Sequence, residues 1–180
     1  KQCGLRNYWV LGDTVQLSVG QGLNLVTPLQ LTNAYATFAN GGSLLAPNIA
    51  CKVSDASGKT VRKFNKRVLG NVDIPPDVRQ PIVEGLEGVV ALPGPEGDRG
   101  TAFEAFHYPN QGGVAFDLGT WRVAGKTGTA EVQGKADNAW FVAFNQDKER
   151  PYVVSALLEE SGFGGSFAAP VVARILDHLL

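Results

Sequence analysis

The sequence predicts an α/β fold of the α+β type, in which an antiparallel sheet is flanked by helices. Three apolar segments, residues 120–132, 138–145 and 152–159, are joined by short polar stretches. Such connections require antiparallel neighbours, because a parallel pair needs a crossover of about a dozen residues or more. A helical repeat of apolar residues follows over 171–180, and that helix must cover one side of the sheet.

The expected helices have recognisable starts. Thr27, Pro28 and Gln30 form a capping box with proline at the first helical position, and the apolar stripe that follows ends at the Asn-Gly-Gly of residues 40–42. The other helices are expected to start at Pro75, near residues 100–103, and at Ser166 as an N-cap.

Strand-like patterns also occur before the three apolar segments. Residues 44–64 predict a hairpin whose turn is the Asp-Ala-Ser-Gly of 55–58. Residues 14–22 alternate apolar and polar side chains briefly before two glycines. Stretches rich in proline and glycine, 92–99 and 108–119, are expected to be loops.

Composition narrows the class of protein. An apolar content of 44% with 18% charged residues indicates a globular chain. A net charge of −1 without an evident Lys/Arg cluster argues against a nucleic-acid partner. No apolar run reaches the length of a membrane span, and no leader is recognised. The two cysteines, Cys3 and Cys51, lack metal-ligand spacing and are expected to be unpaired thiols, with a single bridge between them as the open alternative. Neither a metal nor a cofactor is predicted.

The chemically most informative stretch is residues 123–131, with Lys126-Thr127-Gly128 at its centre. A lysine ammonium and a threonine hydroxyl can both hold the carboxylate of a peptide terminus or of a β-lactam. Gly128 leaves room for a substrate backbone beside the sheet edge. Thr129 can offer its backbone N–H to a developing oxyanion. The triplet occurs in serine acyl-transfer enzymes of the penicillin-binding class.

Other suggestive residues receive structural interpretations. The Gly-Gln-Gly of 20–22 lacks the third glycine of a dinucleotide loop, and the Gly-Lys-Thr of 58–60 lacks the upstream glycine of a phosphate loop. The Tyr-Pro-Asn of 108–110 is a coincidental match to a second active-site motif. Surface or packing roles are expected for His107 and His178, and a solvated pair for Glu159 and Glu160. One of Trp140 and Phe141 is expected in the core, and the other beside the cleft.

Several ordered motifs together resemble class B penicillin-binding proteins, with the elongation branch favoured over the division branch. The motifs are Gly-Gln-Gly at 20–22, Thr-Pro-Leu-Gln at 27–30, Ala-Asn-Gly-Gly at 39–42, Gly-Thr-Ala at 100–102, residues 123–131, Ala-Trp-Phe at 139–141, Gly-Gly at 164–165 and Ala-Ala-Pro at 168–170. The resemblance therefore runs over nearly the whole chain. However, no serine is followed three residues later by lysine, and none begins Ser-x-Asn.

The resemblance implies the C-terminal half of a D,D-transpeptidase domain, similar in fold to serine β-lactamases. Residues 1–119 would form part of the helical lobe with a hairpin and connecting loops, and residues 120–180 the last three strands and the C-terminal helix. Two further strands would precede position 1, which leaves one sheet edge open or otherwise paired. The nucleophile would also lie upstream, so the isolated chain is expected not to react with a fluorescent penicillin.

The implied reaction is acyl transfer between peptidoglycan stem peptides. Lys126 would support proton relay and bind carboxylate, Thr127 and Thr129 would bind substrate, Gly128 would give clearance, and the Thr129 N–H would be half of the oxyanion hole. The implied partners are stem peptides, β-lactam antibiotics, the N-terminal half of the same protein and cell-wall synthesis proteins. The implied location is the extracytoplasmic face of the bacterial cell membrane, with the anchor in a segment outside this chain.

Three alternatives remain open from the sequence. A D,D-carboxypeptidase or a β-lactamase shares the Lys-Thr-Gly triplet, although the flanking motifs argue against both. A penicillin-binding sensor or an inactive scaffold would share the fold without the crosslinking reaction. A binding module complete in these 180 residues is disfavoured by the absent part of the sheet.

Overall fold

The computed structural model describes residues 8–22 and 24–180. The helices are α1 (Leu11–Ser18), α2 (Pro28–Ala39), α3 (Pro76–Ala91), α4 (Phe103–His107) and α5 (Gly164–Leu179), with a 3₁₀ turn at Pro109–Gln111. The strands are β1 (Ser43–Leu45), β2 (Lys52–Ser54), β3 (Thr60–Lys63), β4 (Val68–Asn71), β5 (Val123–Ala130), β6 (Asn138–Asn145) and β7 (Val153–Leu158).

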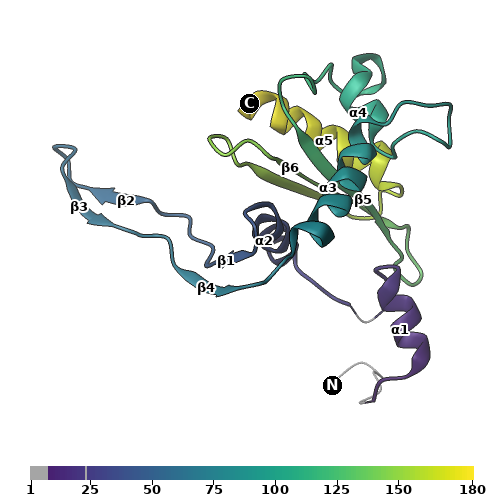
Figure 1. The fold of residues 1–180 in the computed structure, drawn as a ribbon, viewed down its shortest axis with the longest axis horizontal. Coiled ribbons are helices and arrows are strands. Elements are labelled where there is room, and N and C mark those ends of the chain that lie inside the picture. Colours follow the sequence, from purple (N-terminus) through teal and green to yellow (C-terminus); the bar gives the residue numbers. More distant parts are fainter. Residues whose placement is uncertain (1–7, 23) are drawn as a thin grey trace.

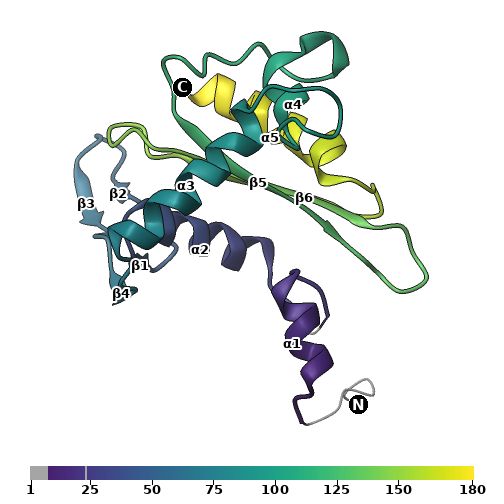
Figure 2. The same cartoon turned by 45° about the vertical axis from the view of Figure 1, so that its right-hand side comes forward.

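The central sheet has the order β5-β6-β7, and both pairs are antiparallel. This confirms the topology that the short connections predict. Helices lie on both faces of the sheet (Figure 2). On one face, Phe141 of β6 is buried in a cluster with Val90 of α3, Phe106 of α4 and Val172 of α5. On the other, the ring of Phe144 meets that of Phe38 in α2 edge-on, with centroids 6.1 Å apart.

The N-terminus of α5 fits closely against the sheet because it begins with two glycines. A Cβ on Gly164 would lie 2.3 Å from the carbonyl oxygens of both Gly128 and Trp140. The predicted N-cap at Ser166 is wrong: the helix begins at Gly164, with Phe163 as N-cap, and Ser166 lies in the first turn. The close approach that the glycines allow extends the helix three residues further toward β5 than predicted.

The prediction for the first described segment also needs correction. Residues 11–18 form α1, although the stretch reads as a brief alternation. Leu11, Val15 and Val19 are spaced four apart, a repeat that fits a helix as well as a strand. Asp13 stabilises the start, where its carboxylate accepts a 2.9 Å hydrogen bond from the Val10 N–H.

Between α2 and α3 the chain forms a projecting arm, residues 43–71 (Figure 1). The predicted hairpin turn at 55–58 is confirmed and joins β2 to β3. The outer strands β1 and β4 pair with each other at the base, and β4 is a strand that the sequence analysis did not assign. The arm is held to the body where Gly42 accepts a 2.8 Å hydrogen bond from the Val72 N–H.

Of the two cysteines predicted to be unpaired, Cys3 lies outside the described residues. Cys51 is a free, exposed thiol in the arm. Among the described residues, no helix is both long and apolar enough to cross a membrane. The same residues contain no cluster of His, Cys, Asp or Glu suited to a metal ion.

Candidate active-site wall on strand β5

Strand β5 presents its Lys-Thr-Gly triplet on two faces, because side chains alternate along a strand. Lys126 and Gly128 lie opposite Val142 and Trp140 of β6 and face a pocket. Thr127 and Thr129 point to the other face, toward Thr101 and the start of α5. The lysine and the two hydroxyls therefore come from one strand but leave it in opposite directions.

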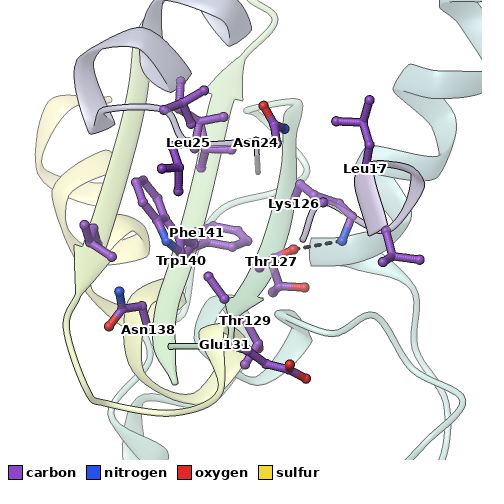
Figure 3. Close-up of a pocket in the computed structure, with 18 of the residues that line it drawn as sticks. Leu17, Asn24, Leu25, Lys126, Thr127, Thr129, Glu131, Asn138, Trp140 and Phe141 are labelled. Atoms are coloured by element: carbon purple, nitrogen blue, oxygen red, sulfur yellow. Dashed lines mark hydrogen bonds between the residues drawn. The ribbon is translucent and has the colours of Figure 1, made fainter. Parts of the chain in front are cut away.

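The pocket has a volume of about 910 Å³ and lies between the sheet, α2 and the segment that follows α1 (Figure 3). Its apolar wall includes Leu25, Tyr35 and Trp140, and its polar wall is β5 from Lys126 to Glu131. Burial raises the pKa of Tyr35 above its ordinary value of 10.0, so this phenol is neutral at physiological pH. An apolar cleft with one polar edge is typical of a site for a small ligand or a peptide end.

Lys126 is exposed at the pocket, and its ammonium donates a 2.8 Å hydrogen bond to the Thr127 carbonyl oxygen. Figure 3 shows this bond along the strand. The charge thus lies beside the sheet edge, where an anion brought to β5 would meet it. No acidic side chain forms a salt bridge with Lys126 within the described residues.

Thr127 is the buried member of the triplet, with 8% of its surface exposed. Its hydroxyl lies 2.9 Å from the hydroxyl of Thr101, and either can donate. Thr101 belongs to the Gly-Thr-Ala of 100–102, which the sequence analysis noted as a motif without a site role. The structure places it where it can orient the Thr127 hydroxyl.

The backbone of Thr129 faces the free edge of the sheet. Its carbonyl oxygen accepts a 3.0 Å hydrogen bond from the side-chain amide of Gln21, and the Glu131 N–H donates to the same amide at 3.3 Å. The N–H and C=O of one residue point to the same side of an antiparallel strand, so the Thr129 N–H faces this edge as well. The Thr129 hydroxyl accepts a 3.4 Å hydrogen bond from the Gly164 N–H.

Gln21 is a neighbour of the site that sequence reasoning missed. Its amide pairs with the β5 edge in the manner of a strand residue. The sequence feature that could have pointed to Gln21 is the pair of glycines on either side of it. Both have positive φ in the structure, 75° for Gly20 and 76° for Gly22. These angles turn the chain so that the glutamine reaches the sheet.

The similarity of this chain to known protein families decides which family it belongs to. The model for the penicillin-binding protein transpeptidase domain matches residues 1–177. This chain belongs to that family. The resemblance inferred from the ordered motifs is therefore confirmed.

Named relatives of this transpeptidase-family chain are consistent with the match. It is 29% identical to peptidoglycan D,D-transpeptidase MrdA of Haemophilus influenzae, in an alignment that covers 100% of this chain and 28% of that protein. It is 31% identical to penicillin-binding protein 3 of Bacillus subtilis, covering 87% of this chain and 20% of the relative. The chain thus spans less than a third of the length of these relatives.

Solved structures confirm the predicted fold class. Pseudomonas aeruginosa PBP2, in complex with WCK 5153, is similar with a TM-score of 0.68 at 29% identity, over 94% of this chain and 32% of that one. A ceftriaxone acyl-enzyme complex of penicillin-binding protein A from M. tuberculosis has a TM-score of 0.69 at 24% identity, over 92% and 35%. The second similarity concerns the fold alone.

The two histidines and the Glu159–Glu160 pair of the transpeptidase-family chain lie in packing or surface positions. His107 stacks on Phe103 with ring centroids 3.7 Å apart, and His178 is exposed in the last turn of α5. Glu159 and Glu160 are exposed, and Glu160 pairs with Lys135. These contacts agree with packing and surface roles.

Trp140 and Phe141 divide between the two faces of β6, as the alternation predicts. Phe141 is fully buried in the core cluster, whereas Trp140 is half-buried and lines the pocket. A Cβ on Gly128 would lie 3.2 Å from the Trp140 Cβ. The missing side chain of Gly128 therefore leaves room for Trp140 on the pocket face.

Proposed function

We propose that this chain is the C-terminal part of a peptidoglycan D,D-transpeptidase of the elongation type and supplies the Lys-Thr-Gly wall of its active site. The observation that carries the proposal is the edge of β5, where the backbone of Thr129 and the ammonium of Lys126 face an open pocket. An extended peptide can add to such an edge as a further strand, in the place that the Gln21 amide takes here. The relatives named D,D-transpeptidase support this choice of reaction.

Each residue of the wall has a role in the proposed acyl transfer. A serine attacks the carbonyl before the terminal D-alanine of a stem peptide, the D-alanine leaves, and an amine of a second stem peptide takes the acyl group. The Thr129 N–H stabilises the oxyanion that forms during attack. Lys126 and the Thr127 hydroxyl leave opposite faces of an edge strand, so both can reach a carboxylate lying beside it. Thr101 positions the Thr127 hydroxyl.

In this proposal the nucleophile lies outside this chain, since none of its serines is followed three residues later by lysine. Residues 120–180 then supply part of the sheet and α5, and residues 1–119 contribute to the helical lobe. The core nevertheless joins both parts, because Val90, Ala102 and Phe106 pack with β5 and β6. The proposed location is the extracytoplasmic face of the cell membrane.

The proposal predicts that a fluorescent penicillin labels the full-length protein and leaves the isolated 180-residue chain unlabelled. In the full-length protein, Lys126→Ala removes a charge-assisted hydrogen bond to the bound carboxylate and should slow labelling by roughly 10- to 100-fold. Lys148→Ala is the matched control, because Lys148 is exposed in the turn between β6 and β7 and far along the chain from the triplet.

Two readouts separate the related activities. A stem-peptide assay on the full-length protein should give crosslinked product. Release of D-alanine without crosslinks would identify a carboxypeptidase, and hydrolysis of the antibiotic would identify a β-lactamase. Penicillin labelling without crosslinks, D-alanine release or antibiotic hydrolysis would identify a sensor or an inactive scaffold. A covalent adduct on the isolated chain would show that the nucleophile has been assigned to the wrong part of the protein.

A further inference from the structure

The arm carries a strong positive charge that the rest of the molecule lacks. Residues 52–67 contain six Lys or Arg and one Asp, a formal charge of +5, while the whole chain carries −1. The remainder therefore has a formal charge of −6. The cations are spread over two strands and their flanks, Lys52, Lys59, Arg62, Lys63, Lys66 and Arg67, and all are exposed.

Where the structure describes the chain, none of these cations forms a salt bridge. Within the described residues, the salt bridges join Arg99 to Glu104, Arg122 to Glu87 and Lys135 to Glu160. The one acid of the stretch, Asp55, accepts hydrogen bonds from Ser57 and from the Lys59 N–H in the hairpin turn. These bonds, with that of the Ser57 hydroxyl first, lower the pKa of Asp55.

The pairing of the two strands concentrates the charge further. Lys52 lies directly opposite Lys63 in the β2–β3 ribbon. Like charges in cross-strand pairs destabilise a ribbon, and a ribbon without a core has little else to stabilise it. An external anion would relieve this repulsion. The ribbon also projects from the body (Figure 1), which leaves both of its faces accessible.

We propose that the arm is a binding site for the anionic peptidoglycan polymer, separate from the active-site wall. The proposal rests on the proposed function, whose substrate is a polymer with a carboxylate at each peptide end. A row of cations on a narrow ribbon matches a repeating polyanion and would raise the local concentration of the polymer substrate.

The arrangement of the side chains favours a polymer over a membrane or a nucleic acid. Lys52 and Lys63 share one face of the ribbon, whereas Arg62 lies on the other face opposite Val53. The ribbon thus lacks the single apolar face of a membrane-surface element. Its one aromatic ring, Phe64, lies 4.7 Å below the guanidinium of Arg62 and is not presented for base stacking.

The test is co-sedimentation of the 180-residue chain with purified peptidoglycan sacculi. We expect the chain to pellet at low salt and to be released near 1 M NaCl, where the screening length falls to about 3 Å. The triple variant K52Q/R62Q/K63Q should bind at least tenfold more weakly. The control K135Q/K148Q/R174Q has the same net charge but removes exposed cations from the body, and it should bind as the parent chain does.

Three results would overturn the proposal: equal binding by the arm variant, equal binding to sacculi whose carboxylates have been amidated, or tighter binding to anionic vesicles or duplex DNA than to sacculi. Circular dichroism of both triple variants reports folding. Penicillin labelling of the full-length arm variant should remain unchanged. If sacculus binding fails while the wild-type protein is labelled and crosslinks stem peptides, only the arm proposal falls.

Discussion

At the scale of single residues, the site depends on glycines as much as on reactive side chains. Gly164 brings the first turn of α5 against the backbones of β5 and β6, and its N–H donates to the Thr129 hydroxyl. A backbone carbonyl cannot rotate away as a side chain can, so an added methyl group must displace the helix from the sheet. This displacement would also break the hydrogen bond that the Thr129 hydroxyl accepts from the Gly164 N–H.

We therefore expect Gly164→Ala to lower the free energy of unfolding by about 1–3 kcal/mol. Gly85→Ala is the matched control, because Gly85 lies inside α3 with nothing within 4 Å of an added Cβ. That change should stabilise the chain by about 0.5–1 kcal/mol through helix propensity. Urea titration followed by circular dichroism measures both, and equal effects would contradict the packing argument.

A second residue-scale prediction concerns alkaline pH. Burial raises the pKa of Tyr35, so the folded state holds its proton more tightly than the unfolded state does. This contribution to stability is complete below the unfolded pKa near 10.0 and is lost as pH rises through the folded value. Tyr35→Phe should lose less stability between about pH 9 and pH 11 than the parent chain. Parallel pH profiles of the two chains would refute this prediction.

At the scale of elements, α2 is a helix whose local sequence and tertiary contacts agree. Thr27 and Gln30 make the reciprocal capping bonds, 3.2 Å to the Gln30 N–H and 2.9 Å to the Thr27 N–H. One turn further on, the Thr32 hydroxyl lies 2.6 Å from that of Ser155 in β7. The cap therefore fixes the end of a helix that forms one wall of the pocket.

Thr27→Ala removes the side-chain acceptor of the cap and should destabilise the chain by about 1 kcal/mol. Thr27→Ser keeps the oxygen and should retain most of the stability. Thermal unfolding followed at the helix band of the circular dichroism spectrum checks both changes. A serine variant as unstable as the alanine variant would show that the methyl group of Thr27 matters more than its hydroxyl.

At the scale of the whole molecule, the described residues leave an apolar surface on the pocket side. Val19 is 69% exposed and Leu25 is 83% exposed, and both line the pocket. Apolar surface gathered around a cleft of this size is typical of a place where another segment or a ligand packs. We expect the proposed remainder of the transpeptidase domain to pack there.

The isolated chain is therefore expected to bind a hydrophobic dye such as anilinonaphthalene sulfonate. Leu25→Ser should reduce the dye fluorescence, because it makes the pocket wall polar. Ile49→Ser provides the control, since Ile49 is fully exposed in the arm and away from the pocket. Equal loss of fluorescence in both variants would place the dye elsewhere.

Much of the fold was predictable because local signals and tertiary packing agree. Short turns specify antiparallel neighbours for β5, β6 and β7, and the capping box specifies α2. The start of α5 was not predictable, since it depends on the backbone of β5 and β6 that the glycines contact. The period of four in α1 fits two structures, and only its capping contacts decide between them.

The sequence by itself determined the family, the Lys-Thr-Gly triplet and the reaction that we propose, because motifs made of consecutive residues can be recognised without the fold. Only the tertiary structure decided that Lys126 and the two threonine hydroxyls leave opposite faces and that Gln21 and Thr101 lie beside them. It also decided that the cations of residues 52–67 lie on one projecting ribbon. Linear inspection did not single out residues 62–67, although Arg62, Lys63, Lys66 and Arg67 already stand close together there. What the linear chain does not show is that Lys52 and Lys59 join them. Strand pairing brings the two ends of the stretch together, because it places Lys52 directly opposite Lys63, eleven positions further along the chain.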